Sequence, residues 1–293
     1  MSNRLLEDPI IQRIIRWGLE RLDVRAAILT SSLCNPSAPV DRLSDYDVIY
    51  VVTDIHPHHA DDSWMEDFGH VLVVWRDPIQ LDYDQERFAR ITQYEEDGLK
   101  IDFTFWPVEL LGRIVAEPHL RPELDSGYLI LLDKDGLAAG IKPPTYRAYI
   151  PRPPTEAEYL EVIEVFLHEA TYMAKFLWRD DLMAAKYMLE KEMKADQLVR
   201  LLEWRMEIDH GWSVKPGVLG RGLKHLTRPD LWVDLERTYV GPGIEENWEA
   251  LFATTDLMRK VAKEVGEALG YAYPEDLHQR VLRHLKWVKN FER

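Results

Sequence analysis

The chain has 293 residues, of which 46% are hydrophobic and 30% are charged, as in a globular protein and unlike a disordered one. Its formal net charge of −15 opposes general binding to nucleic acid, whose phosphates it would repel, and favours cationic small molecules as ligands. The sequence has no run of about 18 apolar residues, the length of a membrane-spanning helix. A single cysteine, Cys34, excludes an internal disulfide framework. We therefore expect a cytoplasmic monomer with no nucleic-acid or membrane partner.

The first half of the chain mixes predicted helices and strands. Isoleucine and leucine residues between positions 8 and 22 recur at helical spacing, which predicts an amphipathic helix. Apolar runs rich in β-branched residues predict strands, and a serine- and proline-rich stretch predicts a loop. In chain order we expect a helix over 8–22, a strand over 25–30, a loop over 31–44, strands over 45–54 and 70–77, a helical stretch near 84–94, a strand over 99–107, a helix over 108–117 and a short strand over 127–135.

A cluster of prolines between 143 and 154 marks a change in composition and predicts an extended linker, because proline interrupts helices. Beyond it the pattern is almost wholly helical. We expect an α+β fold, with a domain containing a mixed sheet over 1–150 and an α-helical bundle over 151–293. The bundle is predicted from helical periodicity over 155–178, 181–208, 245–269 and 274–292.

The sharpest chemical feature is Asp45-Tyr46-Asp47 at the start of a predicted strand. Side chains alternate faces along a strand, so Asp45 and Asp47 project from the same side. Two carboxylates that close repel each other unless a cation lies between them. Oxygen ligands of this kind suit Mg²⁺, which proteins hold with one or two carboxylates while substrate phosphates complete the coordination.

A third acid, Asp102, lies inside the apolar strand predicted over 99–107. Asp102 and Thr104 share one face of that strand, and the large apolar residues share the other. An aspartate in such a strand is costly unless it has a partner. On a strand next to Asp47, it would complete a two-metal site and serve as the general base for an attacking hydroxyl.

A D-x-D sequence alone is also typical of a cap, a turn or a solvated face. The combination is more specific. A serine pair follows one predicted strand, Asp45 and Asp47 open the next, and Asp102 follows about 55 residues later. This order is that of the polymerase-beta-type nucleotidyltransferase fold, which favours catalysis over the structural interpretation.

Several longer motifs follow one another along the chain: DYDVIYVVTD (45–54), DDSWMEDFG (61–69), EDGLKIDFTFWP (96–107), LLDKDG (131–136), TYMAKFLWR (171–179) and ALGYAYPE (268–275). Through these motifs the chain resembles the streptomycin-type aminoglycoside 6-adenylyltransferases over essentially its whole length. The resemblance implies ATP as donor, Mg²⁺ as cofactor, and transfer of AMP to a hydroxyl of a cationic aminoglycoside with release of pyrophosphate. It also implies that Asp45, Asp47 and Asp102 are the metal-binding, catalytic acids.

The loop before the D-x-D departs from the family pattern. Relatives have Gly-Ser-Arg where this chain has Ser31-Ser32-Leu33. In the family fold the glycine allows close backbone approach to the triphosphate, and the serine hydroxyl holds phosphate oxygens. Ser32 keeps the hydroxyl, whereas Ser31 adds a side chain and Leu33 removes a cation. This leaves a second hypothesis open, a nucleotide- or small-molecule-binding relative with lost or altered transfer activity.

The helical half adds weaker candidates. Lys175 and Arg179 are four residues apart and share a helix face, where they would either contact the triphosphate or form a solvated surface pair. A cationic acceptor would be bound by acids and aromatic rings, which pair with and stack on ammonium and guanidinium groups. The candidates for this substrate site are Trp64, Glu158, Glu161, Trp204 and Asp209.

Two other segments imitate known motifs but lack their context. Gly217 to Gly222 is rich in glycine, yet it follows no predicted strand and is interpreted as a flexible connector. The histidine- and aspartate-rich segment 56–62 could be taken for a metal cluster. Because such ligands in one loop lack supporting contacts, we interpret it as a polar loop.

Overall fold

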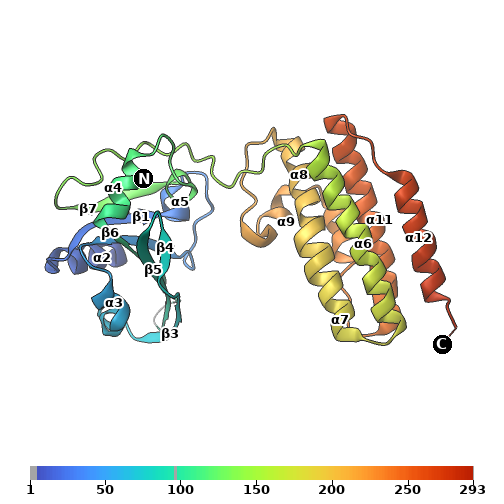
Figure 1. Ribbon diagram of the computed structural model, residues 1–293, viewed down its shortest axis with the longest axis horizontal. Coiled ribbons are helices and arrows are strands. Elements are labelled where there is room, and N and C mark those ends of the chain that lie inside the picture. Colours follow the sequence, from blue (N-terminus) through green and yellow to red (C-terminus); the bar gives the residue numbers. More distant parts are fainter. Residues whose placement is uncertain (1–4, 96–97, 293) are drawn as a thin grey trace. The chain divides into compact units, whose positions relative to one another are not determined.

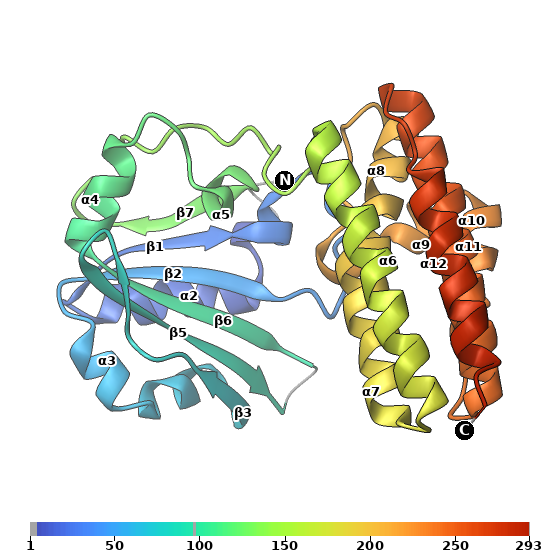
Figure 2. The same ribbon diagram turned by 45° about the vertical axis from the view of Figure 1, so that its right-hand side comes forward.

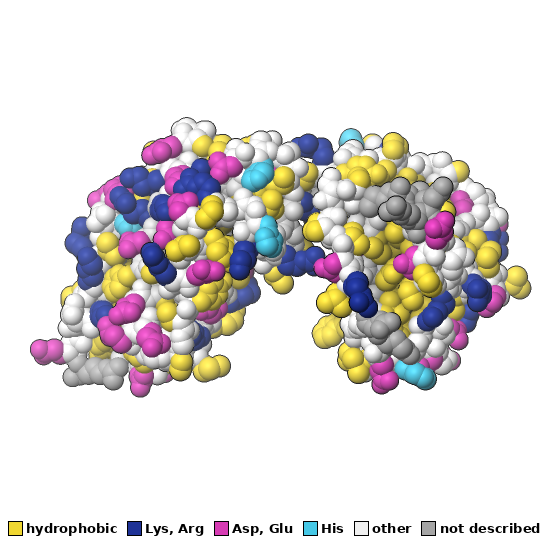
Figure 3. Space-filling view, turned by 180° about the vertical axis from the view of Figure 1, so that it is seen from behind, with side chains coloured by type: hydrophobic (Ala, Val, Ile, Leu, Met, Phe, Trp, Pro, Cys, Tyr) yellow, Lys and Arg dark blue, Asp and Glu magenta, His cyan; other side chains and the backbone are white. Residues whose placement is uncertain are grey.

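The computed structural model describes residues 5–95 and 98–292 (Figure 1). The chain divides into two compact units, one extending to Ala148 and the other starting at Tyr149. None of the described helices combines the length and the apolar character that a membrane span requires. On the face drawn in Figure 3, Lys and Arg side chains are interspersed with Asp and Glu side chains, so charge of both signs is distributed over the described surface there.

The N-terminal unit is built on a seven-stranded mixed sheet. Six strands follow the order β3-β5-β6-β2-β1-β7, visible in Figure 2, and β4 pairs with β5. The β2 and β6 strands run parallel, whereas all the other paired strands are antiparallel. The strands are β1 (Val24–Thr30), β2 (Tyr46–Val52), β3 (Val71–Arg76), β4 (Gln80–Asp82), β5 (Gln85–Tyr94), β6 (Lys100–Pro107) and β7 (Tyr128–Asp133).

Helices cover both faces of this sheet, and each face has its own hydrophobic core. One core joins the sheet to α2 (Pro9–Glu20), α3 (His56–Ala60) and the 3₁₀ helix Ser63–Phe68, and it contains Trp17, Tyr50, Phe103 and Phe105. The other joins it to α4 (Val108–Ala116) and α5 (Pro122–Asp125), and it contains Ile49, Trp106, Leu110 and Leu124. Alternation along β6 therefore directs Phe103 and Phe105 into one core and Asp102 and Thr104 to the opposite face.

The predicted helical stretch near 84–94 is wrong, since this segment is strand β5. Its buried residues recur with a period of two, which is the strand period rather than the helix period. A two-residue turn at Tyr83 and Asp84, both with positive φ, joins it to β4 as a hairpin. This turn contains no glycine, so the usual sequence signal of a hairpin is absent.

The C-terminal unit is helical, which together with the mixed sheet confirms the predicted α+β fold. The helix α6 (Glu156–Trp178) packs against α11 (Ile244–Leu269) and α12 (Glu275–Lys289) around a large apolar core. The predicted helix over 181–208 is present as α7 (Leu182–Tyr187), a π-helical segment (Met188–Leu198) and α8 (Val199–His210). The unit also contains α9 (Leu223–Leu226), α10 (Pro229–Glu236) and a 3₁₀ turn (Val218–Gly220) within the expected glycine-rich connector.

Candidate active site

Two of the predicted acids lie next to each other on the central strands. The parallel register of β2 and β6 pairs Asp47 with Asp102, and the antiparallel register of β1 and β2 pairs Thr30 with Asp47. Directly paired residues project from the same face of a sheet, and neighbouring strands lie about 5 Å apart. Thr30, Asp47 and Asp102 therefore form one row across the sheet, on the face that α4 and α5 cover in part.

Asp45 precedes β2 and joins this row through a lysine that the sequence analysis did not single out. The Lys100 Nζ atom donates to Asp45 Oδ2 at 2.7 Å and to Asp102 Oδ2 at 3.0 Å. Burial disfavours the charged ammonium, but the bonds to both carboxylates outweigh it and raise the pKa of Lys100. A position two residues before Asp102 on the same strand is the signal that could have identified this lysine.

The carboxylates are held where their negative charge is unfavourable. Burial, followed by the charge of Asp102, raises the pKa of Asp47 to about 6. Burial also raises the pKa of Asp102, although its bond to Lys100 acts in the opposite direction. Lys100 therefore neutralises the negative charge of the three aspartates only in part, and a further cation would be stabilised here.

The donor set fits a hard divalent cation such as Mg²⁺. Its ligands would be carboxylate oxygens; among them Asp102 Oδ1 is buried and accepts no hydrogen bond, although the Lys100 ammonium lies 3.0 Å from it. In the described part of the chain, no three Asp, Glu, His or Cys side chains are already gathered around one point. Instead the Lys100 ammonium contacts Asp45 and Asp102, so a cation already bridges two of the three acids.

A cavity of about 290 Å³ opens on the same face and includes both paired aspartates in its wall. Arg87 on β5 also lines it, held by a 3.0 Å bond from its Nε atom to Asp82. Asp82 in turn accepts two bonds from Arg121, at 2.7 and 2.9 Å. Sequence analysis missed Arg87 because it assigned this segment to a helix. The lining residues are Thr30, Asp47, Val48, Ile49, Arg87, Asp102, Thr104, Trp106 and Glu123.

The serine loop lies at the end of β1, directly beside Asp47. Ser31 has a φ of +70°, a left-handed conformation that favours glycine. Its backbone N–H donates to the Gly127 carbonyl at 3.1 Å, and its hydroxyl hydrogen-bonds the Asp47 carboxylate. Ser32 is in the same 3₁₀ turn, while Leu33 is buried in the core. Leu33 therefore contributes apolar packing at this position and no charge.

Trp64 does not form part of this face, which corrects its assignment to the substrate site. Only 7% of its surface is exposed, and its ring packs edge-on against Phe103 and Phe105 in the opposite core. Its indole N–H donates to the His58 carbonyl at 3.1 Å. The ring, predicted to stack on a cationic acceptor, instead closes the space between the 3₁₀ helix and the sheet.

The two glutamates predicted on α6 have different surroundings. Glu158 accepts bonds from Thr155 in a capping box and pairs with Arg152, and these bonds lower the pKa of Glu158 to about 2. Its contacts therefore serve the start of the helix. Glu161 is exposed one turn further along.

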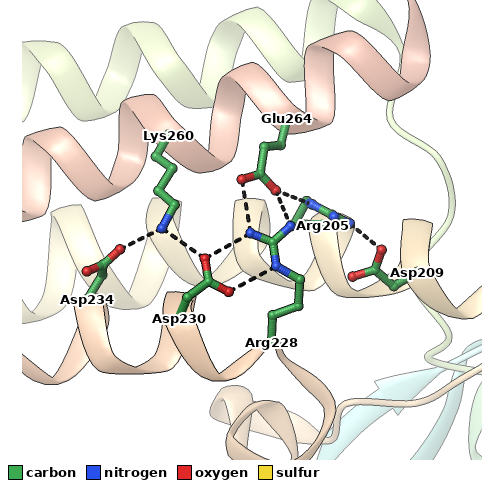
Figure 4. Close-up of polar contacts among 7 residues, drawn as sticks. All are labelled: Arg205, Asp209, Arg228, Asp230, Asp234, Lys260 and Glu264. Carbon is green, nitrogen blue, oxygen red and sulfur yellow. Dashed lines mark hydrogen bonds and ion pairs between the residues drawn. The ribbon is translucent and has the colours of Figure 1, made fainter.

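The candidates on α8 are also already engaged. Trp204 is buried in the helical core, with the Arg200 guanidinium 5.5 Å from its ring centre. Asp209 accepts a 2.7 Å bond from Arg205, which also contacts Glu264. Figure 4 shows that this pair continues into a larger network of ion pairs formed by Arg205, Asp209, Arg228, Asp230, Asp234, Lys260 and Glu264.

Lys175 and Arg179 are exposed at the end of α6. The Lys175 ammonium lies 4.7 Å from the centre of the Tyr172 ring, and Arg179 is the C-cap residue of the helix. A role in binding phosphate stays a prediction for both residues.

The segment 56–62 folds into α3 and its flank rather than into a loop. His58 is buried and lies 2.5 Å from Asp23 Oδ2, and Asp62 pairs with Arg76 and Arg90. These contacts connect the helix to the sheet. Within the described residues, they do not gather the segment into a metal-binding cluster.

Comparison with known proteins identifies similar chains along the whole length. The family model described as Streptomycin adenylyltransferase matches residues 6–288. An aminoglycoside 6-adenylyltransferase of Bacillus subtilis (strain 168) is 29% identical over 272 residues, 92% of this chain and 93% of the relative. One of Campylobacter jejuni is 27% identical over 284 residues, 96% of each chain. A crystal structure of an aminoglycoside 6-adenyltransferase from Bacillus subtilis, 25% identical, covers 96% of this chain and 98% of that one with a TM-score of 0.48.

Proposed function

This chain is a nucleotidyltransferase that belongs to the streptomycin adenylyltransferase family, and we propose that it transfers AMP from ATP to a hydroxyl of a streptomycin-like aminoglycoside. The observation that carries the proposal is the direct pairing of Asp47 with Asp102, with Asp45 joined to Asp102 through Lys100. The names of the relatives, all aminoglycoside 6-adenylyltransferases, support the class of acceptor.

The acids supply both charge and a base. Asp45, Asp47 and Asp102 would hold Mg²⁺, which when bound neutralises phosphate charge and makes the acceptor hydroxyl more acidic. Asp102 accepts the proton of that hydroxyl. The hydroxyl oxygen of the acceptor then forms a bond to the α-phosphorus of ATP, as the bond from this phosphorus to pyrophosphate breaks. A carboxylate with a raised pKa suits the base, because it is a better proton acceptor near neutral pH.

The serine loop would orient the leaving group. Ser31 and Ser32 lie at the end of β1, on one side of the aspartate row, where the Ser32 hydroxyl and the amide of Ser32 would hold phosphate oxygens while Ser31 positions the loop through its bonds to Gly127 and Asp47.

Pyrophosphate release from ATP and Mg²⁺ tests the proposal directly, with streptomycin as acceptor and Asp47→Asn as the control variant. We expect release that requires both the drug and Asp47, and transfer reduced by about 10³-fold in the variant. Release that persists in Asp47→Asn would overturn the mechanism. ATP binding without release on a broad panel of aminoglycosides would favour a binding protein, the second hypothesis raised by Ser31 and Leu33.

A further inference from the structure

An exposed tryptophan lies on the same face of the sheet as the aspartates. The strand registers pair Trp75 of β3 with Ile91 of β5, and Ile91 with Asp102 of β6. Trp75, Ile91, Asp102 and Asp47 therefore continue one row, with Trp75 two strands, about 10 Å, from Asp102. The tryptophan is 67% exposed and is the penultimate residue of β3, an edge strand of the sheet. Its ring is therefore accessible to a ligand on the face that carries the aspartates.

A neighbouring carboxylate fixes the orientation of this ring. The indole N–H of Trp75 donates to Asp77 Oδ1 at 2.8 Å. Asp77 is itself anchored, because its backbone N–H donates to the Ala89 carbonyl and its carbonyl accepts a bond from the buried Arg90 guanidinium. The ring face and the carboxylate are thus presented together, with little conformational entropy left to lose on binding.

The row also has a closed side and an open side. On the β1 side of the aspartates lie the serine loop, Thr30, which is only 5% exposed, and the half-buried Tyr128 of β7. On the β5 side the row ends at exposed Trp75. In an in-line displacement the attacking and leaving oxygens lie on opposite sides of the phosphorus. If the leaving pyrophosphate lies at the serine loop, the acceptor approaches from the side of Trp75.

We propose that Trp75 and Asp77 form a subsite for the acceptor, in which a guanidinium or ammonium group stacks on the indole and pairs with the Asp77 carboxylate. The inference rests on the proposed function, which places phosphates at the serine loop. A cation is favoured over the neutral adenine ring because the indole is an electron-rich face and Asp77 adds a negative charge beside it.

Calorimetry tests the subsite apart from catalysis. Streptomycin is titrated into the full-length protein with Mg²⁺ and α,β-methylene ATP, an analogue whose α–β linkage does not release pyrophosphate. We expect Trp75→Leu to raise the Kd for streptomycin about 10-fold and Trp75→Phe by less. Asp77→Asn keeps the acceptor for the indole N–H but removes the charge, so it should weaken binding several-fold, most strongly at low salt. The Kd for the nucleotide analogue should stay within about two-fold.

A matched control is Trp287→Leu on α12, a tryptophan that is 58% exposed. It should bind streptomycin like the wild type. Unchanged streptomycin binding in Trp75→Leu, a change in nucleotide affinity instead, or no streptomycin binding by the wild type would each overturn the subsite. If the wild type transfers AMP and Trp75→Leu binds streptomycin normally, the subsite is overturned and the proposed function is retained. Weakened binding in the variant of an enzyme that transfers nothing would overturn the function and retain the subsite.

Discussion

The two faces of the N-terminal sheet are made by the same strands, yet they differ in what their side chains can satisfy. On the α2 face, β6 contributes Phe103 and Phe105, which are fully buried and stack on other aromatic rings. On the opposite face the same strand contributes Asp102, with one buried oxygen that accepts no hydrogen bond. One face therefore stabilises the fold, and the other carries unbalanced charge that a ligand can neutralise.

This difference depends on a period of two residues. Shifting the register of β6 by one position would exchange Asp102 with Phe103 and bring a charge into the aromatic core. The packing of the α2 face thus holds the aspartates in place, although it never contacts a substrate. Mutations on the two faces should consequently affect different measurements.

The largest expected effect is on transfer. Asp102→Asn removes the proposed base and a metal ligand, so the transfer rate should fall about 10²- to 10⁴-fold. Stability should be unchanged or higher, because burial raises the pKa of Asp102 and its negative charge is unfavourable in the folded state. Pyrophosphate release measures the loss of transfer, and the thermal midpoint of the same sample measures the stability. A variant that transfers normally, or one that is inactive because it unfolds, would contradict the separation of the faces.

Phe103→Ala should do the reverse. It removes a fully buried ring that packs against Phe68 and Trp64, and such truncations cost about 3–5 kcal/mol of unfolding free energy. Urea titration followed by near-ultraviolet circular dichroism measures the loss. Phe103→Leu should cost less, since it leaves a smaller cavity. Below the unfolding transition the variant should keep transfer within a few-fold of wild type; a loss as large as that of Asp102→Asn would show that the faces are coupled.

These faces also show how far a sequence can predict such a site. Alternation alone correctly separates Asp102 and Thr104 from Phe103 and Phe105, because the strand period is local. The neighbours of Asp102 depend on strand pairing over long sequence separations, which no local pattern specifies.

The missed residues have the same cause. With β5 assigned to a helix, Arg87 could not be placed in the cavity wall. For the same reason the row of side chains from Asp102 through Ile91 to Trp75 could not be predicted, because it depends on the pairing of β5 with its neighbours. Trp64 was chosen by residue type, and only its packing against β6 shows that it belongs to the other face.

A smaller effect is expected on how the free energy of unfolding depends on pH, through Asp47 on the aspartate face of the sheet. The pKa of Asp47 is raised to about 6 in the folded state, so its neutral form contributes stability that is present below the unfolded value and is lost as the pH rises through 6. The full shift corresponds to at most about 3 kcal/mol. Urea midpoints of wild type and Asp47→Asn should diverge between pH 4 and pH 7, with the variant more stable at pH 7. Parallel curves would contradict the raised pKa. Added Mg²⁺ should reduce the divergence.

The smallest effect concerns the loop that borders the aspartate row. Ser31 has a left-handed backbone, and Ser31→Gly should relieve about 1 kcal/mol of conformational strain, offset in part by the greater freedom of glycine in the unfolded chain. It also removes the hydroxyl that bonds Asp47, so the pKa of that carboxyl should rise further.

Ser31→Ala separates these two consequences, because it removes the same hydroxyl but keeps the strained φ. Urea titration at pH 7 should therefore rank Ser31→Gly above Ser31→Ala in stability, while titration of Asp47 by NMR should show similar upward shifts of its pKa in both. Equal stability of the two variants would mean that the strain at Ser31 is no larger than the entropy that glycine gains in the unfolded chain. Serine would then be as compatible with this loop as glycine, and the remaining effect of its side chain would come from the bond to Asp47.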